Sequence, residues 1–243
     1  MANPNKVAGS PLEDELAPDA PPLRTAGTLL ARAFNARLDS ERFADKRGLL
    51  IAHGIRLFHR KGVNGTGVAE LLAEANMGKG QFYHYFESKE DFVCAVLRHE
   101  MDFFLKHFSP IMADLPGLDG FEQWFEPYLG LADLPDNLGC PVGVIACEMS
   151  GSSAKVRETA AANLLRWTGA MAQGLRCLQS HLPMADDFIP ELAAEYIAST
   201  IQGALLLGRT FRSNRYILQA RGEVKRYLEG ARRTTCHSQS DLG

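Results

Sequence analysis

The sequence predicts an all-α fold. Apolar residues recur at helical spacing along most of the chain, whereas the apolar–polar alternation that is typical of strands is nowhere sustained. Proline and glycine interrupt the helical pattern at intervals, as expected at the ends of helices. With 243 residues, of which 46% are apolar, the chain is long enough to bury a sizeable core.

The first forty residues are expected to stand apart from the main fold. Residues 1–23 hold five of the twelve prolines, in a composition that buries too little apolar surface to offset the entropy lost on ordering. We therefore predict a disordered tail there. Residues 24–40 predict an extra helix, because their apolar residues share one helical face: Leu29, Leu30, Ala33, Phe34 and Leu38.

Three short helices are predicted within residues 41–88. The first carries apolar residues at helical spacing and ends at Gly62. The second and third cover 68–75 and 79–86, and a tight glycine-containing turn at 76–78 joins them. This part of the chain therefore predicts a small, separate three-helix domain.

A larger helical domain is predicted over residues 89–232. Ser88 has a side chain that can cap a long helix, which we expect to run to about Phe108, before Pro110. Residues 233–243 are expected to form a flexible tail. Further helices are predicted near 119–132, 141–150, 153–181, 187–210 and 213–231.

Several classes of protein are excluded by what the sequence lacks. No apolar stretch reaches the length of a transmembrane helix, and the N-terminus has no apolar segment of the kind that a signal peptide needs. Five cysteines without a CxxC pair argue against a disulfide framework or a zinc ribbon. We therefore predict a cytoplasmic protein that does not enter membranes and holds no metal or cofactor.

The charge is distributed unevenly along the chain. The whole chain has 26 basic and 29 acidic residues, a net charge of −3. Residues 42–89, however, hold eight basic and four acidic residues, a net charge of +4 that leaves −7 for the remainder. A basic segment in an acidic chain is typical of a domain that binds a polyanion.

The basic segment has the pattern of a helix-turn-helix. Two short helices joined by a tight turn, with basic and aromatic residues on the second, suit a recognition helix that enters the major groove of DNA. Gly78 and Gly80 remove side chains where the backbone would approach DNA. Gln81 carries an amide that can bond to adenine, and its neighbours offer further polar groups to phosphates or base edges: Tyr83, His84 and Tyr85.

These residues resemble a known family. The segment FHRKG at 58–62, followed by GTGVAELLAEANMGKGQFYHYFESKEDF at 65–92, is similar to the DNA-binding domain of TetR-family regulators. The resemblance covers roughly residues 43–92. It implies an all-helical homodimer with a DNA-binding head and a body that binds a small molecule. Such proteins are usually repressors that leave a palindromic operator when the small molecule binds.

The resemblance also assigns roles to individual residues. Thr66 stands where the family often has a phosphate-binding hydroxyl, and Lys89 matches a basic residue at the start of the fourth helix. Gly67 and Gly78 depart from the family, which often has Ser or Thr at these helix starts. The positions that usually face DNA correspond to Lys79, Gly80, Gln81, Tyr83, His84 and Tyr85.

The predicted body has the residues of an apolar ligand pocket. Aromatic and other large apolar side chains can form the walls of such a pocket, although the same residues can equally be ordinary core. The candidates for the pocket are Trp124, Phe125, Trp167 and Met171, together with Cys140.

Cys140 lies in the motif Gly139-Cys140-x-x-Gly143, which is followed by an acidic residue. The motif resembles a TetR subgroup that includes regulators responding to electrophiles, oxidants or acrylate-like compounds. Because Cys140 is near a helix start, the helix dipole would lower its pKa and favour a reactive thiolate. The alternative is a small buried apolar residue beside the pocket.

A dimer interface is predicted on the last two helices. The apolar face of residues 197–208 includes small residues that allow close helix contact, and the resemblance implies that these helices form a four-helix dimer interface. The candidate interface residues are Ile201, Ala204, Leu205, Gly208 and Ile217.

Other functions remain open at this point. Covalent modification of Cys140 is one alternative, and a transcriptional activator or an adaptor that does not bind DNA is another. The helix at 24–40 either packs on the protein or contacts DNA outside the main motif. An enzyme is not expected, because the sequence shows no nucleophile–base motif, metal-ligand cluster or phosphate loop.

Overall fold

The computed structural model describes residues 45–132 and 139–233, so the expectations for residues 1–44 and 234–243 lie outside it. The all-α prediction is confirmed: within the described residues there are helices and no strand. The elements in chain order are α2 (Lys46–Lys61), α3 (Val68–Glu74), α4 (Lys79–Tyr85), α5 (Lys89–Ala113), the 3-10 helix η2 (Leu118–Trp124), α6 (Glu126–Ala132), α7 (Pro141–Met149), α8 (Ala154–His181), α9 (Pro190–Phe211) and α10 (Arg215–Gly230).

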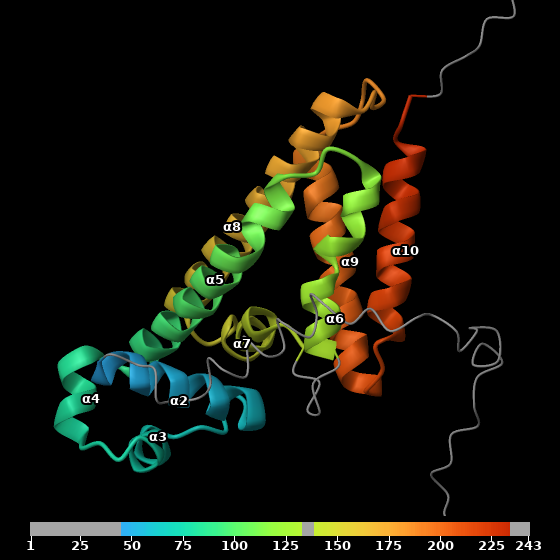
Figure 1. Cartoon of the computed structure of the whole chain (residues 1–243). Helices are drawn as coiled ribbons and strands as arrows, with labels where there is room; N and C mark the ends of the chain where they lie inside the picture. The colour runs from blue at the N-terminus through green and yellow to red at the C-terminus, as the bar shows by residue number, and fades with distance from the viewer. Residues whose placement is uncertain (1–44, 133–138, 234–243) are drawn as a thin grey trace, which may run out of the picture.

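Helices α2, α3 and α4 form a head at one end of the molecule, and α5 leads from it into a body made of α5 to α10 (Figure 1). The head is held to α5 by aromatic packing, in which Phe92 of α5 lies 5.8 Å from Phe58 and 5.6 Å from Phe82 between ring centroids. Gly54 of α2 makes room for this ring, because a Cβ there would lie 2.3 Å from Phe92 Cζ.

The body is a bundle in which the long helices pack against one another. Helix α5 packs along α8, α8 along α9, and α9 along α10. Gly174 of α8 allows α5 to approach closely, since a Cβ there would lie 1.8 Å from the carbonyl oxygen of Met112 in α5. None of the helices in the two described ranges has the length and apolar character needed to cross a membrane.

Two helix boundaries differ from the sequence prediction. Helix α5 does not stop before Pro110 but continues to Ala113 with the proline inside its last turns. Residues 119–132 are not one helix, because η2 ends at Trp124 and α6 begins at Glu126. The apolar periodicity continues across this break, and so the sequence pattern alone does not reveal it. Ser88 caps α5 as predicted: its hydroxyl accepts a hydrogen bond from the Asp91 N–H at 3.1 Å.

Candidate functional sites

Helix α4 presents polar side chains at the outer surface of the head. Lys79, Gly80 and His84 are exposed, and the Tyr83 side chain is 58% exposed. Phe82, between them, is fully buried and anchors the helix in the core of the head. One buried residue therefore anchors α4, while cationic and aromatic side chains lie on its exposed face. That face is free to contact a partner.

Gln81 holds the start of α4. Its side-chain oxygen accepts a hydrogen bond from the Gly78 N–H at 3.0 Å, which is the half of a capping box that needs no side chain at Gly78. Its amide nitrogen remains a donor. A Cβ at Gly78 or Gly80 would meet no atom of the chain, so packing within the protein does not explain these glycines.

Thr66 is buried and Lys89 is half-buried, so both are less accessible than the residues of α4. Thr66 is 2% exposed, and its hydroxyl donates to the Gly62 carbonyl at 2.8 Å. The Lys89 ammonium donates to the Val63 carbonyl at 2.7 Å. Burial lowers the pKa of Lys89, and the Glu148 carboxylate partly offsets this. Both side chains therefore hold the loop between α2 and α3, and a phosphate contact by either stays a prediction. Tyr85 is half-buried, and its ring lies 4.8 Å from that of His84.

Much of the positive charge of the head is engaged within the head. Arg60 pairs with Glu74 at 2.7 Å, and Lys61 pairs with Glu70. Arg47 lies over the ring of Phe86, 5.4 Å from its centroid. The head therefore has more basic residues than are available to contact a partner at α4.

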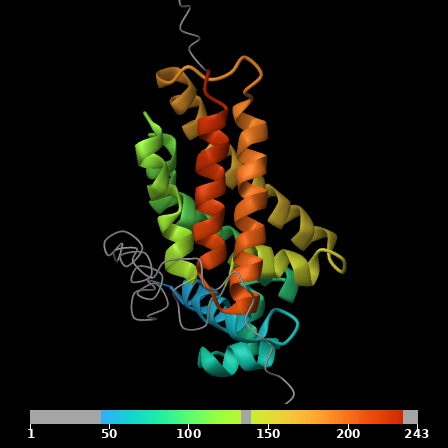
Figure 2. The same ribbon diagram turned by 90° about the vertical axis from the view of Figure 1, so that its right-hand side faces the viewer.

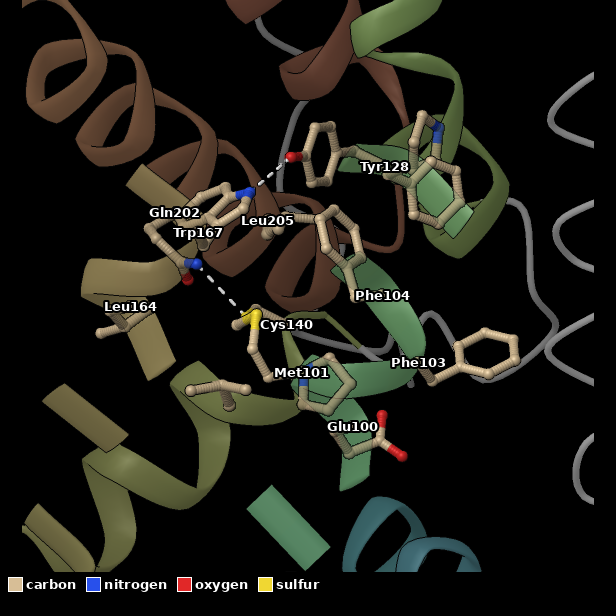
Figure 3. A pocket seen from close by; sticks show the side chains of 14 residues that line it. Glu100, Met101, Phe103, Phe104, Tyr128, Cys140, Leu164, Trp167, Gln202 and Leu205 are labelled. Carbon is tan, nitrogen blue, oxygen red and sulfur yellow. Dashed lines mark hydrogen bonds between the residues drawn. The ribbon is translucent and has the colours of Figure 1, made fainter. Parts of the chain in front are cut away.

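A cavity of about 60 Å³ lies inside the body (Figure 3). Two of the predicted pocket residues, Cys140 and Trp167, are in its lining. The other three, Trp124, Phe125 and Met171, are buried core residues outside the lining of this cavity, and their part in a ligand site stays a prediction. A buried aromatic residue in a helical bundle looks the same in sequence whether or not a cavity borders it.

Two polar residues of the lining, Glu100 on α5 and Gln202 on α9, were missed by the sequence prediction. A third polar residue of the lining is Tyr128 on α6. The Tyr128 hydroxyl accepts a hydrogen bond from the Trp167 indole N–H at 2.9 Å. Glu100 could have been noticed in the sequence, because an acidic residue on the inward apolar face of a long helix is unusual.

The glycines beside Cys140 have steric reasons in the structure. Gly139 adopts a positive φ of 66°, which side chains rarely tolerate. A Cβ at Gly143 would lie 2.8 Å from the side-chain oxygen of Gln202. The Cys140 sulfur accepts hydrogen bonds from the Gly143 N–H at 3.3 Å and from the Gln202 amide at 3.2 Å (Figure 3). The motif thus allows α7 and α9 to approach each other closely around this sulfur.

The ionisation of Cys140 differs from the sequence expectation. Burial raises the pKa of the Cys140 thiol, and hydrogen bonds from Gln202 and Gly143 only partly counteract it. The N-terminal position on α7 therefore does not make this cysteine a thiolate at neutral pH. Desolvation outweighs the stabilising donors because the sulfur is enclosed by the cavity wall.

Helix α7 joins the cavity to the head. Cys140, Pro141 and Val142 at its start line the cavity, and Glu148 in its last turn accepts a hydrogen bond from the Asn64 N–H at 3.0 Å. Asn64 belongs to the loop between α2 and α3. In Figure 1, α7 lies directly beside α2 at the junction of head and body.

The predicted interface residues on α9 and α10 face the inside of a single chain. All five are buried within it, with Ile201 at 1% and Ile217 at 0% exposure, and their part in an interface stays a prediction. A different set of large apolar side chains on these helices is exposed. Helices α9 and α10 stand side by side on one face of the molecule (Figure 2). The exposed residues there are Leu192, Tyr196, Leu206, Leu207, Phe211, Leu218 and Tyr227.

Comparison with known proteins gives consistent matches along the chain. The family model for bacterial regulatory proteins of the tetR family matches residues 50–96. The model for the C-terminal domain of LmrA/YxaF-like transcriptional regulators matches residues 130–223.

Individual proteins agree with the family models. An uncharacterised HTH-type transcriptional regulator from the lacX 3′ region of Lactococcus lactis is 31% identical over 63% of this chain and 77% of its own length. The HTH-type transcriptional repressor DhaR of Mycobacterium sp. strain GP1 is 27% identical over 65% of this chain and 79% of its own. The crystal structure of reduced Escherichia coli NemR superimposes with a TM-score of 0.69 at 25% identity, covering 75% of this chain and 96% of NemR.

Proposed function

The chain belongs to the TetR family of bacterial transcriptional regulators, and we propose that it acts as a homodimeric repressor that releases a palindromic operator when a small molecule enters its cavity. The observation that carries this proposal is the pairing of an outward-facing α4 with a cavity whose wall includes the start of α7. One helix thereby contacts both the effector site and the head.

The size of the cavity supports control by ligand binding. At about 60 Å³, it is far smaller than the several hundred Å³ typical of a pocket for a drug-sized ligand. Because protein interiors are closely packed, a larger ligand has to displace part of the wall. The start of α7 is part of that wall, and so we expect ligand entry to change the position of α7 relative to the head.

Operator binding tests the assignment of the head. We expect the double substitution Lys79→Ala, Tyr83→Ala to weaken operator binding about 100-fold, since it removes a cation and an aromatic hydroxyl from the exposed face of α4. The operator is first selected from random DNA by the full chain, and affinity is then measured by fluorescence anisotropy at physiological salt. Lys106→Ala is the matched control, because Lys106 is an exposed cation on α5 in the body. If the double variant binds like the control, the assignment of α4 is wrong.

Covalent control through Cys140 is a second candidate, favoured by the position of its sulfur in the cavity wall. Because burial raises its pKa, the fraction present as thiolate at neutral pH is lower than for an ordinary cysteine. We expect iodoacetamide to modify the exposed Cys147 before Cys140, and Cys140 to react faster as the pH rises. Mass spectrometry of peptides over a time course at two pH values measures this order.

Two results would count against covalent control. Modification of Cys140 that leaves operator affinity unchanged would reject it. Conversely, fast modification of Cys140 at neutral pH, ahead of Cys147, would contradict a raised pKa of the Cys140 thiol.

A further inference from the structure

The wall of the cavity indicates the polarity of its ligand. We propose that the cavity takes a small uncharged molecule without hydrogen-bonding groups, such as a hydrocarbon ring. The proposal rests on the proposed function only in taking this cavity as the effector site. Its evidence is that apolar groups form the surface that a ligand would contact, whereas polar groups of the lining bind one another.

The surface of the cavity is almost entirely apolar. Polar atoms contribute almost none of it, so even the carboxylate of Glu100 adds hardly anything, although this residue belongs to the lining. None of the fourteen lining residues is Lys, Arg or His. Nine of them have purely apolar side chains: Met101, Phe103, Phe104, Phe108, Pro127, Pro141, Val142, Leu164 and Leu205.

Polar groups of the lining are directed at each other. The Trp167 indole N–H donates to the Tyr128 hydroxyl at 2.9 Å, and the Gln202 amide donates to the Cys140 sulfur at 3.2 Å (Figure 3). Burial raises the pKa of Tyr128 and that of Cys140, so both groups are uncharged at neutral pH. A ligand that needs a hydrogen bond would have to break one of these pairs.

Aromatic rings form a continuous part of the wall. Phe104 lies 4.7 Å from Phe108 and 5.9 Å from Tyr128 between ring centroids, and Tyr128 lies 6.1 Å from Trp167. These separations are typical of aromatic packing, and a ring-shaped ligand can extend the same contacts. The wall therefore offers an apolar ring favourable partners without any polar group.

A polar or charged ligand would lose its hydration without compensation. Transfer of a polar group from water into apolar surroundings is unfavourable unless a hydrogen bond replaces the one lost, and transfer of a charge is more unfavourable still. An apolar molecule has no such loss and gains from leaving water. The wall therefore discriminates by polarity.

A hydrocarbon ring also fits the proposed response to ligand. Apolar protein cavities of about 150 Å³ take up benzene. The present cavity has about 60 Å³, so a ring would enter only if the wall widens. The start of α7 belongs to that wall, and its displacement is the change expected of an effector.

Four compounds of similar shape and different polarity test the proposal: benzene, pyridine, benzoate and benzylammonium. Binding to the full chain is measured by titration calorimetry at pH 7. We expect benzene to bind about 30-fold more tightly than pyridine, because the ring nitrogen would be buried without a donor. The two charged compounds are expected to bind more weakly than pyridine.

A hydroxyl group in the wall should reduce this preference. Val142→Thr exchanges a methyl group for a hydroxyl of similar size, and we expect the preference for benzene over pyridine to fall about tenfold. Val144→Thr is the matched control, because Val144 is half-buried in the same helix but is not in the lining. It is expected to leave the preference within about twofold of the wild-type value.

A larger side chain in the wall should locate the binding site. Leu164 is half-buried and lines the cavity, so we expect Leu164→Trp to weaken benzene binding about tenfold by occupying space. Leu165→Trp is the control, because Leu165 is the next residue of α8 but is exposed and outside the lining. If Val142→Thr does not fold, this pair and the order of the four compounds still decide.

Three outcomes would overturn the proposal. They are the absence of saturable benzene binding, pyridine or a charged compound binding as tightly as benzene, and benzene binding that Leu164→Trp leaves unchanged. Operator binding is measured in the same samples. Benzene binding without operator release would contradict the proposed function alone, whereas operator release by a charged compound that binds in this cavity would contradict only the ligand class.

Discussion

Replacing Gly174 with alanine is expected to destabilise the protein by about 3 kcal/mol. A Cβ at this position would lie 1.8 Å from the Met112 carbonyl oxygen and 2.5 Å from Trp124 Cζ2. The first of these atoms belongs to the backbone of α5, so a change of side-chain rotamer cannot relieve the clash. Helices α5 and α8 would have to separate, and the core between them would lose contact. Urea unfolding of the full chain, followed by circular dichroism, measures the loss.

Gly169→Ala is the matched control for Gly174→Ala. Gly169 lies in the same helix but is exposed, and a Cβ there would meet no atom within 4 Å. Alanine at this position is expected to stabilise the protein by about 0.5–1 kcal/mol, because glycine is unfavourable inside a helix. Similar changes for the two variants would contradict the steric explanation, since helix propensity alone acts on both positions in the same direction.

Substituting Leu206 with glutamate is expected to convert a dimer into monomers. Leu206 is 64% exposed within one chain and lies on the exposed apolar face of α9, together with Leu207 and Phe211. If this face forms the proposed dimer interface, a two-fold axis introduces the charge twice into an apolar contact. Burying an unpaired charge costs about 3–5 kcal/mol, and so we expect dimerisation to weaken about 100-fold or more.

Sedimentation velocity and operator affinity provide two readouts for this variant. Operator binding should fall with dimerisation, because a monomer contacts only one half-site. Leu165→Glu is the matched control: Leu165 is 69% exposed but belongs to α8 and not to α9 or α10. A Leu206→Glu variant that remains dimeric would place the interface elsewhere. If both substitutions cause dissociation, the loss of the dimer is not specific to a charge on the exposed face of α9.

The sequence predicts the head better than it predicts individual contacts in the head. The helices follow from periodicity and turns, and the exposure of Lys79 and Tyr83 agrees with their place in the recognition segment. That they contact DNA stays a prediction. Thr66 and Lys89 could not be placed from the sequence, because the carbonyl groups that they bind belong to a loop whose path is set by tertiary packing.

The body shows a different limit of sequence analysis. Helix α9 is apolar on two faces, one of which packs inside the chain while the other is exposed, and periodicity does not distinguish them. For this reason Ile201 and Leu205 were predicted at an interface although they are buried in the monomer. The cavity presents the same difficulty, since Trp167 is in its lining and Trp124 is not.

The length of helix α7 is the distance between the cavity wall and the contact with the head. It has nine residues, which at 1.5 Å per residue correspond to about 13 Å from its first turn to its last. Its own backbone hydrogen bonds make it stiff along its axis, so a shift imposed on Pro141 is carried to Glu148 without side chains acting as relays. The cavity wall and the head are therefore separated by one rigid element of about two and a half turns.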